Sequence, residues 1–165
     1  MTPPWSILTP DSATGDKARA IYAIWKDLAG ERFAPRRQDI TLPQVSKLSP
    51  WLWLIDVMDG GRDFRFRLAG DRIVQFLGGR HQGMRLSELP LNPFFVRMRH
   101  TLVHCVEHKK PIALGPVETG YPGKEHWAME VVVLPLSDDG ETVDCMLGTM
   151  ELWPLHTKQC ARAAP

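Results

Sequence analysis

The segment that most constrains the fold is residues 51–70, where two strand-like runs flank a glycine turn. The first run, WLWLIDVM, is rich in aromatic and β-branched residues, which are typical of strands. The second, RDFRFRLAG, alternates apolar side chains with arginines, as a strand with one buried face does. Asp59-Gly60-Gly61 lies between them, so the sequence predicts a β-hairpin. A purely helical fold is thereby excluded.

Two amphipathic helices are predicted on either side of this hairpin. In residues 15–28 the apolar side chains of Ile21, Trp25 and Leu28 fall at helical spacing. Asn92-Pro93 is a typical helix start, an N-cap residue followed by proline, and the helix it opens runs to about residue 107. A short helix is expected over residues 71–77.

Three more strands are expected after the second helix, over residues 112–119, 126–134 and 143–152, separated by glycine-containing turns. Strands segregated in this way, with helices inserted after the hairpin, indicate an α+β fold with an antiparallel sheet. We divide the chain into an irregular N-terminal arm (1–13), one domain (14–153) that includes a flanking helix at 15–29, and a short C-terminal tail (154–165).

Composition excludes several classes of function. With 20 basic and 19 acidic residues, the chain lacks the charge excess of a nucleic-acid binder, so a nucleic-acid partner is not expected. No apolar run approaches the about 20 residues that span a bilayer, and no secretory leader is evident, so no membrane insertion is expected. Three cysteines without a CxxC pair are typical of a reduced, cytoplasmic protein.

The order of these elements, with several local phrases, resembles the PAS sensory domains. The phrases are IYAIWKDLAG, LPQVSKLSPWLWLIDV, FRFRLAGDRIVQFLG, the G-x-x-L-S-E-L run at 83–89, and the closing VVVLPLSDDGETVDCMLGTMEL. The resemblance is strongest to stand-alone bacterial PAS-like proteins once grouped as a domain of unknown function. It implies a five-stranded antiparallel sheet with helices on one face and an N-terminal flanking helix. It also implies a non-catalytic, sensory or regulatory role, through a small metabolite or a signalling protein partner.

A ligand pocket in such a fold would lie between the helices and the sheet. The candidate lining residues are Trp53, Phe66, Arg67, Phe76, Met98, Leu102, Met129, Val131 and Met146. The methionines would let a cavity repack around different ligands. Arg67 either pairs with a ligand carboxylate or lies with Arg65 on the solvent or partner face. A filled core is the alternative for the whole set.

Haem and covalent flavin are not expected as cofactors. The histidines of the longer helix, His100, His104 and His108, fall opposite its apolar stripe, so they should face away from a pocket. Their i, i+4, i+8 spacing makes them weak surface candidates for a metal. Residues 70–91 contain no cysteine for a covalent flavin bond.

The resemblance implies a homodimer formed through the flanking helix, with Ile21, Trp25 and Leu28 as interface candidates. No P-loop, GxSxG elbow or HExxH motif is present, so an enzyme is not expected. Two alternatives remain open: a structural adaptor without a ligand, and a small α+β enzyme with an open, cystatin-like cavity.

Overall fold

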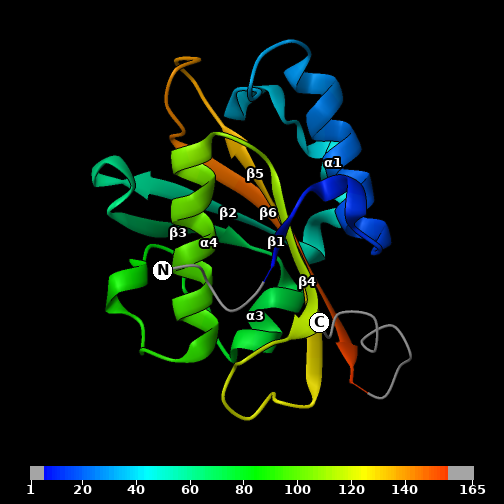
Figure 1. Cartoon of the computed structure of the whole chain (residues 1–165), viewed down its shortest axis with the longest axis vertical. Coiled ribbons are helices and arrows are strands. Elements are labelled where there is room, and N and C mark those ends of the chain that lie inside the picture. The colour runs from blue at the N-terminus through cyan, green and yellow to red at the C-terminus, as the bar shows by residue number, and fades with distance from the viewer. Residues whose placement is uncertain (1–5, 156–165) are drawn as a thin grey trace.

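The computed structural model describes residues 6–155 and arranges them around one antiparallel sheet of six strands. The predicted α+β class with an antiparallel sheet is confirmed, and the spatial strand order is β1-β4-β5-β6-β2-β3 (Figure 1). The strands are β1 (Ile7–Leu8), β2 (Leu52–Met58), β3 (Asp63–Ala69), β4 (Ile112–Glu118), β5 (Trp127–Leu136) and β6 (Cys145–Pro154).

Helices precede and interrupt the strands as expected. The α-helices are α1 (Asp16–Ala29), α2 (Leu42–Val45), α3 (Asp71–Leu77) and α4 (Pro93–His108). Short 3-10 turns are η1 (Pro10–Ser12), η2 (Arg37–Asp39), η3 (Ser46–Trp51), η4 (Asp59–Gly61) and η5 (Leu86–Glu88). The predicted cap of α4 is present, because the Asn92 side chain accepts a hydrogen bond of 3.0 Å from the Phe95 amide.

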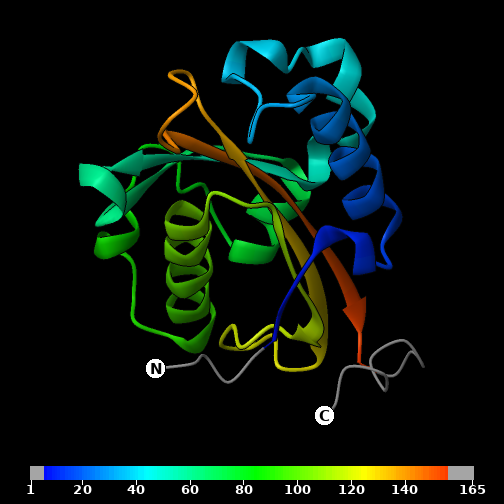
Figure 2. The same ribbon diagram turned by 45° about the horizontal axis from the view of Figure 1, so that its top comes forward.

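The helices form two layers, one on each face of the sheet (Figure 2). Helices α3 and α4 cover one face, and their apolar side chains pack with Val131 and Val133 of β5. The flanking helix α1 covers the other face, where it packs with Val132 and Leu134 of the same strand. The alternation of side chains along β5 therefore serves two cores, which explains its almost continuous apolar sequence.

The N-terminal arm differs from the prediction. Ile7 and Leu8 pair with Leu114 and Ala113 at the edge of β4, which adds a sixth strand to the five expected. The turn η1 then leads into α1. The prediction of an irregular arm was therefore wrong for residues 7–12: two residues are too few to show the alternation by which a strand is recognised in sequence. Of the predicted tail, residues 156–165 lie outside the described residues.

Candidate functional site

A cavity of about 50 Å³ lies between the helices and the sheet. Strands β2, β3, β4, β5 and β6 form its floor, and α3 and α4 form its roof. Its walls are almost entirely apolar. The lining residues are Trp53, Ile55, Phe66, Ala69, Ile73, Leu77, Phe94, Arg97, Met98, Thr101, Leu102, Leu114, Met129, Val131, Val133 and Met150. The cavity is thus the inner part of the α3–α4 core, left partly unfilled.

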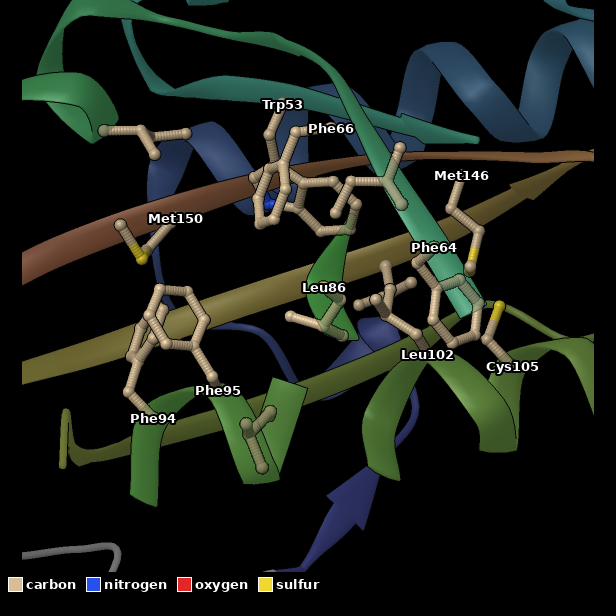
Figure 3. Packing of buried hydrophobic residues seen from close by; sticks show 14 of the residues in the cluster. Trp53, Phe64, Phe66, Leu86, Phe94, Phe95, Leu102, Cys105, Met146 and Met150 are labelled. Atoms are coloured by element: carbon tan, nitrogen blue, oxygen red, sulfur yellow. The ribbon is translucent and has the colours of Figure 1, made fainter. Parts of the chain in front are cut away.

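Trp53 takes its place in this wall because a glycine lies opposite it. Trp53 and Gly148 are direct partners in the β2–β6 pairing. A Cβ on Gly148 would come within 2.1 Å of the Trp53 ring, so only glycine lets the indole lie across β6. Figure 3 shows the Trp53 ring next to Phe66, with Phe94 and Phe95 from α4 facing the sheet across from them.

Most of the predicted pocket residues meet in this wall. Six line the cavity, namely Trp53, Phe66, Met98, Leu102, Met129 and Val131. Sequence reasoning missed the contributions of Phe94, Thr101 and Met150, although each lies on a segment that was correctly predicted as helix or strand. It also missed Arg97, whose Nη1 donates a 2.6 Å hydrogen bond to the Glu118 carbonyl. Burial lowers the pKa of Arg97.

Phe76 and Met146 do not line the cavity, so the prediction was wrong for both. Phe76 is buried on the outer side of α3, where its ring centroid lies 5.7 Å from that of Phe94 and 5.2 Å from that of Tyr121. Met146 is fully buried in the cluster that also contains Phe64 and Cys105, shown at one end of the core in Figure 3.

Arg67 lies on the opposite face of the sheet, so its assignment to the pocket was wrong. Its Nε donates a 2.8 Å hydrogen bond to Asp56, and Arg65 donates to the other oxygen of the same carboxylate at 3.1 Å. Alternation along β3 puts Arg65 and Arg67 on that side, because Phe64 and Phe66 face the core, and the bulge next to Arg67 turns Leu68 to the same side. Burial alone would raise the pKa of Asp56, but hydrogen bonds from Arg67 and Arg65 outweigh it and lower the pKa. The alternative, Arg67 on the outer face with Arg65, is confirmed.

Two buried carboxylates hold the start of α1 against the sheet. Glu130 of β5 accepts hydrogen bonds from the Gly15 amide at 2.7 Å, and from the amide and hydroxyl of Thr14 at 3.0 and 2.9 Å. Glu151 of β6 accepts from the Ala18 amide at 3.2 Å and the Lys17 amide at 3.4 Å. We call this pair with its partners the carboxylate clamp. It satisfies amides that the first turn of a helix leaves without partners.

The clamp explains the glycine before α1. Glu130 and Glu151 are direct partners in the β5–β6 pairing, so their carboxylates converge on one point. A Cβ on Gly15 would lie 1.8 Å from a Glu151 oxygen, so no larger residue fits between the helix and the two acids. Burial is the main cause that raises the pKa of Glu151, and the charge of Glu130 adds to it.

The histidines of α4 lie outside the cavity wall. His100 and His108 are exposed, and the rings of His104 and His108 stack with centroids 3.9 Å apart. Burial lowers the pKa of His104, and so does the neighbouring His108. Within residues 6–155, no group of three or more His, Cys, Asp or Glu side chains is arranged to hold a metal ion.

The three dimer-interface candidates on α1 differ in how deeply they are buried. Ile21 is fully buried, and the Trp25 indole donates a 2.8 Å hydrogen bond to the Pro135 carbonyl of its own chain. Leu28 is half-buried. The apolar stripe of α1 is therefore the contact between this helix and the sheet, which leaves Ile21 and Trp25 no surface to offer to a second copy.

The family model described as "PAS domain" matches residues 14–151. The chain is similar to the solved PAS domain of histidine kinase ThkA, at 16% sequence identity and a TM-score of 0.43, over 61% of this chain and 98% of that one. No curated protein matches. Within the described residues, no helix is both long and apolar enough to cross a membrane.

Members of the matched family are in general sensory modules rather than catalysts. The match extends from the clamp at the start of α1 to the last strand, and so includes every element that lines the cavity. The chain belongs to the PAS domain family.

Proposed function

We propose that this PAS domain is a sensor that takes a small apolar molecule into the cavity and uses α1 as its output element. A water molecule needs about 10–15 Å³ of cavity, so about 50 Å³ is room for more than one. Apolar cavities stay dry and accept apolar guests. Met98, Met129 and Met150 line the wall, and methionine side chains adapt readily to a guest of different shape.

The observation that carries the proposal is that the same two strands face both the cavity and the clamp. On β5, Met129 and Val131 line the cavity, and Glu130 between them points to α1 on the other face. On β6, Met150 lines the cavity, and Glu151 next to it holds the first turn of α1. A shift of either strand that accommodates a guest therefore changes the hydrogen bonds of α1 directly.

Such a sensor works by a shift between two states. A guest changes the position of α1 only if it binds more tightly when the clamp has one geometry than when it has another. The output would then pass to a signalling protein partner that contacts α1 or the surface next to it.

Xenon, a monatomic apolar probe, tests the cavity. We expect xenon to raise the thermal unfolding temperature and to shift the NMR signals of the Met129 and Met150 methyl groups. Ala69→Leu adds side-chain volume at the half-buried edge of the cavity and should abolish both effects while the protein stays folded. Absence of xenon effects in the wild type, or equal effects in the variant, would favour the ligand-free adaptor instead.

We also propose that the outer face of β2 and β3 is a protein interface, and that its occupant is a second copy of this chain. Leu68 is 53% exposed there, beside half-buried Leu54, its partner in the β2–β3 pairing. Arg67 and Asp56 form an ion pair next to these leucines. A patch with an apolar centre and a paired-charge rim is typical of protein interfaces.

The oligomeric state of Leu68→Arg tests this interface. We expect light scattering to show a dimer for the wild type and a monomer for the variant, because a charge at the apolar centre opposes association. Leu42→Arg is the matched control, since Leu42 is also exposed but lies on α2. A monomeric wild type, or a dimer that survives Leu68→Arg, would contradict the proposal.

A further inference from the structure

A surface groove of about 310 Å³ lies where the outer side of α3 meets the ends of η3, β5 and β6. It is about six times as large as the cavity and shares no lining residue with it. Its wall is about equally polar and apolar, whereas the cavity wall is almost entirely apolar. The lining residues are Trp51, Arg72, Gln75, Phe76, Lys124, Trp127 and Leu152. We call it the tryptophan groove.

Two half-buried indoles come together in this groove. Trp51 ends η3 and Trp127 begins β5, so the fold brings side chains from distant parts of the sequence to one place. Phe76 and Leu152 add apolar surface to the same wall. Flat aromatic walls favour a flat aromatic guest, because rings stack on one another over a large contact area.

The charge of the groove is positive. Arg72 and Lys124 line it, and no carboxylate does. Among residues 6–155, neither of these two cations has an ion-pair partner. Lys17 of α1 brings a third positive charge, since its Nζ lies 4.6 Å from the centroid of the Trp51 ring, and the Arg72 guanidinium lies 5.9 Å from the same ring.

The carboxylates near these elements have other partners. Asp71 lies 3.9 Å from Arg80, and Glu125 accepts a 2.9 Å hydrogen bond from the Gly123 amide. Glu151, which also acts on Lys17, accepts from the amides at the start of α1. An anion that enters the groove would therefore meet Arg72 and Lys124 without displacing an existing ion pair.

We propose that the tryptophan groove is a second ligand site, distinct from the cavity, and that it binds a small planar aromatic carboxylate. The ring lies against Trp51 and Trp127, and the carboxylate pairs with Arg72 and Lys124. Gln75 at the edge offers a further hydrogen bond. The volume falls at the lower end of the about 300–1,000 Å³ that is typical of small-molecule sites.

Titration with 2-naphthoate, followed by NMR of the tryptophan indole N–H groups, tests the site. We expect the signals of Trp51 and Trp127, assigned with single Trp→Phe variants, to shift with saturation. The Trp25 indole, hydrogen-bonded on the other face of the sheet, is an internal reference that should not move. Trp53 reports on the cavity and should not move either.

Charge recognition is tested with a matched probe and matched variants. The double variant Arg72→Gln/Lys124→Gln should weaken 2-naphthoate binding about tenfold, as expected for two solvent-accessible charge contacts. The neutral amide of the same shape, 2-naphthamide, should bind the wild type more weakly by a similar factor. Lys110→Gln, which changes an exposed cation outside the groove, should bind as the wild type does.

Three outcomes would overturn the proposal. One is equal binding of 2-naphthoate and 2-naphthamide, which would remove the role of the cations. Another is unchanged affinity in the double variant. The third is a shift of the Trp53 signal with no shift of Trp51 and Trp127, which would place the probe in the cavity. None of these outcomes bears on xenon binding, so this site and the proposed sensor cavity can fail separately.

Discussion

Glu130→Gln should destabilise the protein by about 2 kcal/mol, although it changes a carboxylate to an amide of the same shape. The Gln oxygen can still accept from the Gly15 amide, as Glu130 does at 2.7 Å. The new NH₂ group, however, would face the Thr14 amide, which now lies 3.0 Å from the second carboxylate oxygen and would keep only its longer contact of 3.2 Å to the first. The charge assistance and the shorter hydrogen bond of a partly buried donor are lost together, which costs about 2 kcal/mol.

Urea unfolding measures this effect. With a slope of about 2 kcal/mol per molar, typical of a small protein, the midpoint should fall by about 1 M. Glu141→Gln is the matched control, because this glutamate is exposed and its side chain is in none of the described hydrogen bonds. Amide exchange should speed up most at the start of α1. A midpoint within experimental error of that of the control would refute our account of the clamp.

Three further results are expected from the same structure. Gly15→Ala should lower the free energy of unfolding in urea by about 2 kcal/mol, because the new methyl group displaces the Glu151 carboxylate, which accepts hydrogen bonds from two amides. Unchanged stability of the variant would contradict this. The pKa of Asp56 is lowered in the folded protein, so this carboxylate stabilises the fold fully above its ordinary pKa of 3.8 and ceases to do so as the pH falls through the lower folded-state value. In acid unfolding, Asp56→Asn should lack this loss of stability, and the control Asp27→Asn should keep it. Burial raises the pKa of Cys105 and Cys145 to about 12, so both thiols should resist a thiol reagent in the native protein and react on unfolding. Rapid modification of either residue in the native protein would contradict this.

The elements that could be predicted from sequence are those whose patterns are local. The hairpin at 51–70, the helix opened by Asn92-Pro93 and the three late strands follow from alternation, turn residues and capping, and the structure contains each of them. Six of the nine pocket candidates line the cavity for the same reason, because side-chain alternation fixes the face of a strand or helix. The same alternation places Arg67 on the outer face with Arg65, so its assignment to the pocket went against this rule, and it is Leu68 that the neighbouring bulge turns outward.

The features that could not be predicted depend on contacts between distant segments. The apolar stripe of α1, which includes Ile21 and Trp25, has the same sequence pattern whether it forms a dimer interface or packs in the core. Only the fold shows that it packs on the sheet. Glu130 and Glu151 stand out as acids within apolar strands. Their convergence on Gly15 requires the β5–β6 register, which no local pattern gives.

Hydrogen exchange at the Lys17 and Ala18 amides reports whether the cavity and α1 are coupled through the two strands they share. These amides donate to Glu151, whose neighbour Met150 lines the cavity. We expect saturation with xenon to change their exchange rates in the wild type, and to leave them unchanged in Ala69→Leu. Exchange rates unaffected by xenon in a wild-type protein that binds it would contradict the coupling.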